Sequence, residues 1–200
     1  MKNTILIISL FLCCNLFAQS QDNQKLGVKT SFNLSSMIGS SVENSRLKFG
    51  YTAGIYYSTS RQKKVNLYTE ILGNFKGGNF KNGNTGYSKI ALFYIDASIL
   101  PNLSLANNRS ISIGPSFSYL GLSSVYVGDK KKPEDQTLDL SPFDMGLASF
   151  YTISQKIVSY QFGVKIGLMN INHIAQNNLM PVINPSGTIR NFSVEIGMLF

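Results

Sequence analysis

The sequence predicts an all-β fold, an eight-stranded antiparallel up-and-down transmembrane β-barrel that is preceded by a cleaved signal peptide. Apolar residues alternate with polar or small ones in eight segments, and a period of two is the repeat of a strand with one apolar face. The connections between the segments alternate between short and long, as in barrels that span a membrane. The segments also fit the ~9–11 residues that a tilted strand needs to cross a bilayer.

The start of the chain has the pattern of an export signal. Lys2 precedes a short apolar run, and the small residue Ala18 follows it. The run is shorter than the ~20 apolar residues that a spanning helix requires. We therefore expect a signal peptide at residues 1–18, cleaved after Ala18 or after Gln19, and one outer-membrane barrel domain at residues 19–200.

Cysteine content and charge bound the protein further. Cys13 and Cys14 both lie inside the expected signal, so the mature chain must be stable without disulfides. The formal net charge is +8. This excess indicates either a solvated basic surface or contact with anionic lipid headgroups or acidic glycans. Nucleic acid is not expected as a partner of an exported chain.

Four segments make up the first half of the expected barrel. In the first, Val28 and Phe32 share one face, and Lys29 lies on the other. The fourth is less regular, because Leu92 and Leu100 fall on its polar face. The four segments are residues 26–34, 48–58, 65–76 and 87–100.

The second half is built in the same way. Pro115 interrupts the fifth segment, and because proline cannot donate to a strand ladder, we expect a local bulge there. The last segment alternates most strictly and ends on an aromatic residue. The four segments are residues 110–119, 143–151, 158–168 and 188–200.

The last strand has two expected roles. It must pair with the first strand, because a sheet in hydrocarbon cannot leave an edge unpaired. Its apolar positions also form the expected C-terminal insertion signal for the barrel-insertion machinery of the cell. These positions are Phe192, Val194, Ile196, Met198 and Phe200.

The connections divide into two sets. Short turns are expected at residues 58–64, 101–108 and 154–156, which follow strands two, four and six. Glycine and asparagine content marks residues 77–86 as part of a loop. The long loops, at the other end of the barrel, are expected at residues 35–47, 76–87, 123–141 and 170–187.

The two faces of the strands differ in chemistry. One face is nearly free of charge and gathers aromatic residues near strand ends, as interfacial girdles require; they are Phe49, Tyr57, Phe75, Tyr119, Phe143, Tyr151 and Phe200. The other face is rich in glycine and serine, which suits the interior of a narrow barrel. It also carries an expected interior charge network of Lys29, Glu70, Asp96, Asp144, Lys165 and Glu195.

Short motifs follow one another along the chain: Gly27-Val28-Lys29, Gly50-Tyr51-Thr52-Ala53-Gly54, Leu67-Tyr68-Thr69-Glu70, Tyr94-Ile95-Asp96, Gly114-Pro115, Phe143-Asp144-Met145-Gly146-Leu147, Gly163-Val164-Lys165-Ile166-Gly167 and the terminal Phe200. In order and spacing they resemble the PorT-like outer-membrane β-barrel family over essentially the whole mature chain. The resemblance implies an outer-membrane barrel and little about activity. That family usually has a proline soon after the acidic residue of strand four, where this chain has Ala97 and Ser98.

No catalytic or cofactor-binding constellation is evident. His173 is the single histidine and lies in an expected loop, so neither a metal site nor a nucleophile–histidine–acid set can be assembled. A small lipid-modifying enzyme would need such a set. The run Lys130-Lys131-Lys132 indicates a solvated loop tip or a contact with lipopolysaccharide phosphates.

These observations predict a non-enzymatic outer-membrane protein without a cofactor, structural or acting as a surface or assembly partner through its long loops. Its expected partners are outer-membrane lipid, lipopolysaccharide and the barrel-insertion machinery. Two alternatives stay open. One is an accessory component of a protein secretion or envelope complex. The other is a soluble periplasmic lipocalin-like carrier, whose strands alternate too but turn the apolar face inward.

Overall fold

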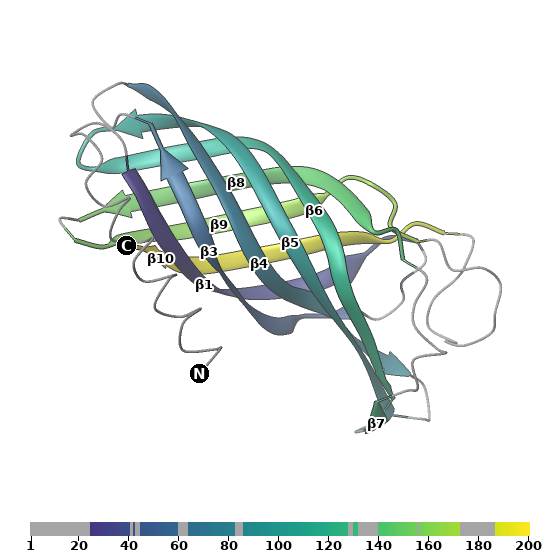
Figure 1. Cartoon of the computed structure of the whole chain (residues 1–200). Coiled ribbons are helices and arrows are strands. Elements are labelled where there is room, and N and C mark those ends of the chain that lie inside the picture. Colours follow the sequence, from purple (N-terminus) through teal and green to yellow (C-terminus); the bar gives the residue numbers. More distant parts are fainter. Residues whose placement is uncertain are drawn as a thin grey trace, which may run out of the picture.

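The structure is a computed structural model that describes residues 25–40, 42, 45–59, 64–82, 86–127, 130–131, 140–155, 157–172 and 187–200. Within these residues, eight long strands form one closed sheet (Figure 1). They are β1 (Lys25–Ile38), β3 (Lys48–Ser58), β4 (Val65–Asn82), β5 (Gly86–Leu105), β6 (Arg109–Val127), β8 (Phe143–Ser154), β9 (Ser159–Gly167) and β10 (Arg190–Leu199). Two short strands add to this sheet. β2 (Ser45–Arg46) pairs with β4, and β7 (Lys130–Lys131) pairs with β6.

Three expectations fall on residues that the structure does not describe. They are the signal peptide at residues 1–18 with both cysteines, His173, and Lys132 of the lysine run. In the described part of the chain, no helix is long and apolar enough to cross a membrane.

The barrel closes by antiparallel pairing between its last and first strands. The β1–β10 ladder runs from Lys29 opposite Leu199 to Ile38 opposite Arg190. Past its end, the Phe200 N–H donates to the Val28 carbonyl at 2.9 Å, and the Val28 N–H donates back at 3.2 Å. Each of the other long strands pairs with its neighbours along the chain. The predicted all-β, eight-stranded antiparallel barrel is thereby confirmed.

The strand ends that short connections join lie at one end of the barrel, and the strand ends that longer connections join lie at the other (Figure 1). Residues 59–64, 106–108 and 155–158 join β3 to β4, β5 to β6, and β8 to β9. We call this end the short-turn end and the opposite one the long-loop end. The predicted placement of the two sets of connections agrees with the structure, although several boundaries do not.

Two of the expected connections are strand instead. Residues 77–82 continue β4, and residues 101–105 continue β5. The β4–β5 ladder is unbroken from Val65 opposite Leu103 to Asn82 opposite Gly86. Glycine and asparagine content was a misleading guide here, because a tight hairpin partner supplies the hydrogen bonds that intrinsic propensity does not. β1 and β6 are also longer than expected and run to Ile38 and Val127. At the long-loop end, β4, β5 and β6 project beyond the other strands (Figure 1).

The predicted bulge at Pro115 is also wrong. Pairing between β5 and β6 lapses around Pro115 but resumes in the same register, with Ser98 opposite Ser116 and Asn102 opposite Ser112. Pro115 faces outward opposite Leu147 of β8. Pro101 of β5 lies in the same gap, and since proline has no N–H, the two prolines interrupt the ladder without inserting an extra residue. The register shift instead lies between Phe93 and Tyr94 of β5.

The apolar face of the strands points out of the barrel. Ile71, Ile113 and Ile196 are 56%, 58% and 59% exposed although each lies mid-strand. Aromatic rings line the outside towards the long-loop end, where they contact each other in the pairs Phe32–Phe49, Tyr51–Phe75, Phe75–Phe93 and Tyr119–Phe143. The exterior is therefore an apolar belt with an aromatic border.

The interior contains two apolar clusters, one towards each end. The mouth cluster lies at the long-loop end and consists of Met37, Phe80, Ile90, Leu92, Tyr94, Leu140, Ile171 and Ile189. The floor cluster lies towards the short-turn end and consists of Tyr56, Tyr68, Leu100, Ala148, Phe150 and Leu199. Leu92 and Leu100, which interrupt the polar face in the sequence, belong to these clusters and are 1% and 0% exposed.

Candidate functional site: the charged interior and its two ends

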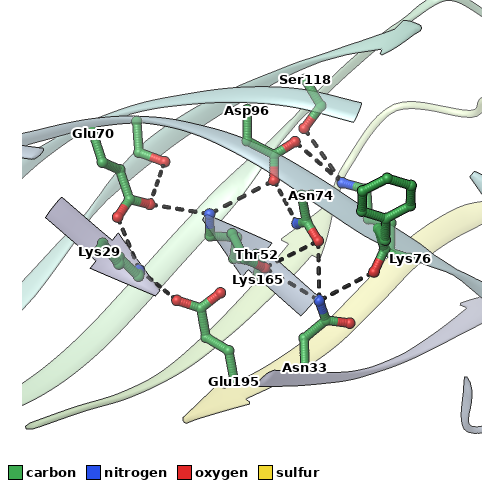
Figure 2. Close-up of polar contacts among 12 residues, drawn as sticks. Lys29, Asn33, Thr52, Glu70, Asn74, Lys76, Asp96, Ser118, Lys165 and Glu195 are labelled. Atoms are coloured by element: carbon green, nitrogen blue, oxygen red, sulfur yellow. Dashed lines mark hydrogen bonds and ion pairs between the residues drawn. The ribbon is translucent and has the colours of Figure 1, made fainter. Parts of the chain in front are cut away.

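Five ion pairs join charged side chains across the interior (Figure 2). Lys29 of β1 reaches two carboxylates, with its Nζ 2.9 Å from Glu70 Oε2 and 2.5 Å from Glu195 Oε1. Lys165 of β9 lies 3.0 Å from Glu70 Oε1 and 3.6 Å from Asp96 Oδ2. β9 and β4 are not neighbours in the sheet, so this contact spans the lumen.

A third lysine extends the chain of charges. Lys76 of β4 lies 3.4 Å from Asp96 Oδ1. Side chains of this network are between 0% and 8% exposed. Such deeply buried charges are tolerated only when they are paired and hydrogen-bonded. We refer to Lys29, Glu70, Lys76, Asp96, Lys165 and Glu195 as the lumen network.

Neutral polar groups complete the coordination of the carboxylates. Asn74 donates to Asp96 Oδ2 at 2.7 Å. Glu70 accepts hydrogen bonds from the Ser98 hydroxyl at 3.1 Å and from the Tyr68 hydroxyl at 3.1 Å. Asn33 then links this layer to the next strands by donating to Asn74 Oδ1 at 3.0 Å and to Thr52 Oγ1 at 3.2 Å (Figure 2).

Aromatic rings hold the lysines from the side. Lys29 Nζ lies 4.1 Å from the centroid of the Phe150 ring, and Lys165 Nζ lies 5.6 Å from it. Lys76 Nζ is 4.1 Å from the centroid of Tyr94. A cation over an aromatic face gains further stabilisation when water is excluded. Phe150 can reach this position because Gly163 faces it across the β8–β9 ladder, where an added Cβ would overlap the ring.

Most of the sequence-predicted interior charges meet in this network, and Asp144 does not. Among the described residues Asp144 makes no ion pair; its Oδ2 accepts from Asn191 Nδ2 at 2.8 Å, and its Oδ1 has no hydrogen-bond partner there. A cavity of about 10 Å³ adjoins Asp144, Lys76 and Lys165. That volume is near the minimum for one water molecule.

Two interior lysines were missing from the sequence-based set. Both lie on the polar faces of their expected segments, Lys48 at the first position of one and Lys76 at the last position of the other, but neither belongs to the expected charge network. In the structure Lys48 Nζ donates to the Lys76 carbonyl at 3.1 Å. Strand parity carried the signal, because Lys76 shares the face of Glu70 on β4 and Lys48 shares the face of Thr52 on β3. With them, the buried charges of the described residues balance, as Lys29, Lys48, Lys76 and Lys165 oppose Glu70, Asp96, Asp144 and Glu195.

The mouth cluster closes the long-loop end above the lumen network. Segments that follow β6 and β9 fold into the opening, where the Ser141 N–H donates to the Ile171 carbonyl and the Ile171 N–H donates to the Ile189 carbonyl, each at 2.9 Å. Leu140, Ile171 and Ile189 are 6%, 0% and 0% exposed. The lumen is therefore filled by charge in the middle and by apolar side chains above it.

A cavity of about 430 Å³ lies at the short-turn end, beneath the floor cluster. We call it the vestibule. Its walls are mostly serine, asparagine and tyrosine side chains of β3, β4, β5, β6 and β8. In the part of the chain that the structure describes, no group of three or more histidine, cysteine, aspartate or glutamate residues could hold a metal ion there or elsewhere.

Comparison with known proteins agrees with this architecture. No protein-family model and no curated protein matches the chain. Among solved structures, the crystal structure of Neisserial surface protein A is similar with a TM-score of 0.53 and 13% sequence identity, over 89% of this chain and 98% of that one. Ail of Yersinia pestis has a TM-score of 0.47 and 6% identity over 90% and 100% of the two chains. The outer membrane protein OprG from Pseudomonas aeruginosa has a TM-score of 0.47 and 9% identity over 88% and 94%.

The first of these similarities concerns the fold. It covers nearly all of both chains, and it supports the closed eight-stranded antiparallel barrel derived above from pairing and burial. Membership of the PorT-like family, which the motifs suggest, stays a prediction because no family model matches. The chain thus has the fold of a small, eight-stranded β-barrel that is similar to Neisserial surface protein A.

Proposed function

We propose that the protein is a non-enzymatic outer-membrane barrel with a sealed lumen, which acts as a structural element or as a surface partner through its long-loop end. The single observation that carries the proposal is the inversion of its two faces. Apolar side chains cover the outside, whereas paired charges fill the inside.

The apolar belt supports a lipid environment. Phe32, Ile71 and Leu147 are 64%, 56% and 48% exposed, and they belong to three different strands. Soluble monomers rarely expose contiguous apolar patches larger than a few hundred Å². In the hydrocarbon core of a bilayer, an apolar belt of this kind has no unfavourable contact with water. The same environment requires that every backbone hydrogen-bonding group is paired, as it is in a closed barrel.

The interior argues against the lipocalin-like carrier. A soluble carrier of that kind turns its apolar face inward around a ligand. Here the lumen between the two clusters holds Lys29, Glu70 and Lys165, whose side chains are at most 8% exposed. An apolar ligand would have to displace ion pairs in order to enter, and the loss of one partner alone costs about 3–5 kcal/mol.

The orientation follows from the class of barrel. Barrels of the outer membrane keep their short turns in the periplasm and their longer loops outside. In that orientation the projecting parts of β4, β5 and β6 face the cell exterior, together with Lys130 and Lys131 of β7. This projection favours a partner at the surface, whether lipopolysaccharide or a component of a secretion or envelope complex. The last strand, up to Phe200, would be the segment that the insertion machinery recognises.

Fractionation tests the proposal directly. Cells that express the full chain are separated into soluble, inner-membrane and outer-membrane fractions, and each fraction is run on a gel with and without boiling. We expect the protein in the outer-membrane fraction, with faster migration when unboiled because the closed barrel stays folded. Recovery in the soluble periplasmic fraction would overturn the proposal and restore the carrier alternative.

A further inference from the structure

The vestibule is a preformed cavity that the proposed structural or surface role does not require. Its volume of about 430 Å³ falls within the ~300–1,000 Å³ range of small-molecule sites. It opens at the short-turn end, and the floor cluster separates it from the lumen network. If the barrel lies in the outer membrane as proposed, the vestibule faces the periplasm, and the present inference rests on that orientation.

A chain of hydrogen bonds fixes the polar wall of the vestibule. The Ser112 hydroxyl donates to Asn102 Oδ1 at 2.7 Å, and Asn102 Nδ2 donates to Asn66 Oδ1 at 2.9 Å. Asn66 Nδ2 in turn donates to the Ser104 hydroxyl at 3.4 Å. Each primary amide has two donor hydrogens and two acceptor lone pairs, so this wall retains capacity for a ligand while its rotamers are held.

The turn between β5 and β6 adds two further amides at the rim. Asn107 and Asn108 have φ angles of 61° and 57°, in the left-handed region. Glycine would adopt this conformation more easily than asparagine. Both asparagines line the vestibule. The turn therefore presents two side-chain amides to the cavity, although its backbone conformation would suit glycine.

The charge of the lining restricts the ligand. Among the described residues that line the cavity, Arg109 is the one charged side chain, and the others are amides, hydroxyls, two tyrosines and two leucines. Amides and hydroxyls in this density match a ligand that carries many hydroxyl groups. A single exposed guanidinium matches one anionic group rather than a polyanion.

We propose that the vestibule binds a saccharide that carries one carboxylate, with Arg109 at the carboxylate and the asparagine wall at the hydroxyl and acetamido groups. Such a ligand could be a free sugar acid or the sugar acid of a cell-wall glycan. Both sources present the same chemistry to the site where the sugar carboxylate of the glycan is not linked to a peptide, and the experiment below separates them.

A matched pair of sugars tests the proposal. N-acetylmuramic acid and N-acetylglucosamine share a ring and an acetamido group, and the former adds a lactyl carboxylate. Each is titrated into the purified, isotope-labelled barrel in lipid nanodiscs, and amide NMR shifts are followed. We expect saturable shifts at the residues of the β5–β6 turn and at Thr152 and Ser154, with affinity for the acidic sugar about tenfold higher.

Variants separate the two parts of the site. Arg109→Ala should reduce the affinity for N-acetylmuramic acid to that for N-acetylglucosamine. The double variant Asn107→Gly/Asn108→Gly, whose turn accepts the same backbone conformation, should weaken both sugars about tenfold or more. Lys64→Ala is the control, because Lys64 is exposed at the same end without lining the cavity. All variants should retain heat-modifiable migration on gels.

Titration with soluble glycan strands, released from cell-wall sacculi by an amidase that removes the stem peptides and frees the lactyl carboxylates, then distinguishes the sources. Binding to both the monomer and the strands supports a glycan ligand, and binding to the monomer alone supports a free sugar acid. Absence of saturable shifts for either sugar, or an unchanged preference in Arg109→Ala, would overturn the inference. A correctly inserted barrel that binds no sugar leaves the proposed function intact, whereas a protein absent from the membrane would remove both.

Discussion

Replacing Lys29 by methionine should destabilise the barrel by about 3–5 kcal/mol, the typical cost of leaving a buried charge without its partner. The structure assigns that cost mainly to Glu195. Its Oε1 loses the Lys29 Nζ at 2.5 Å, and its Oε2 has no hydrogen-bond partner among the described residues. Glu70 is affected less, because it keeps Lys165 at 3.0 Å and the hydroxyls of Tyr68 and Ser98.

A double-mutant cycle isolates this interaction. Glu195→Gln removes the orphaned charge, so Lys29→Met/Glu195→Gln should recover at least half of the lost stability, since a neutral substitute for a buried ion pair is often tolerated. Ser193→Ala, on the same strand and face, is the matched control and should cost about 1 kcal/mol or less. The free energy of unfolding is measured in urea after refolding into lipid vesicles.

Two results would refute the reasoning. If the losses in Lys29→Met and in Glu195→Gln simply add in the double variant, the two side chains are not coupled. If Lys29→Met costs no more than Ser193→Ala, water or another group already solvates Glu195, and the lumen network does not have the pairing described.

Three further predictions concern the lumen, its packing and the last strand. In planar bilayers the refolded protein should show no stable porin-sized conductance, because the lumen network and the mouth cluster fill the interior; a steady open pore would contradict this. Gly163→Val should destabilise the barrel, because the Phe150 ring occupies the space of the added side chain, and Phe150→Ala in the same chain should relieve part of that loss. Circular dichroism melting in detergent measures the stability of both variants. Purely additive losses would disprove the contact. Phe200→Ala should lower the yield of membrane-inserted protein in cells and affect refolding in detergent much less. Cell fractionation measures the first effect, and refolding gels measure the second. Equal effects in both assays would mean that Phe200 contributes packing to the barrel and has no role in insertion.

The sequence reveals which face each residue occupies but not how high along the barrel it lies. Alternation placed Lys29, Glu70 and Glu195 inside, and closure of the sheet made β10 a neighbour of β1. Which charges meet depends on the stagger between strands, which no single strand encodes. Lys165 therefore contacts Glu70 across the lumen, while Asp144, on an equally polar face, contacts Asn191 instead.

Strand ends were predicted less well for a related reason. Glycine and asparagine around residues 77–82 indicate a loop when intrinsic propensity is considered alone. The neighbouring β5 supplies an unbroken ladder, so the segment is strand. Propensity fails here because pairing with a partner that lies nearby in the chain outweighs it. Lys76, the last residue of the expected segment, lies well inside this longer strand and reaches Asp96 in the lumen.

The most direct test of the account measures which isoleucine side chains contact lipid. Methyl NMR spectra are recorded in nanodiscs with and without lipids that carry a nitroxide in the acyl chain. The outward methyl groups of Ile71, Ile113 and Ile196, which are 56%, 58% and 59% exposed, should broaden strongly, whereas those of the fully buried Ile90 and Ile189 should not. Broadening of the outward methyls by a water-soluble relaxation agent, with no effect of the labelled lipid, would contradict a lipid-facing belt around a charged lumen.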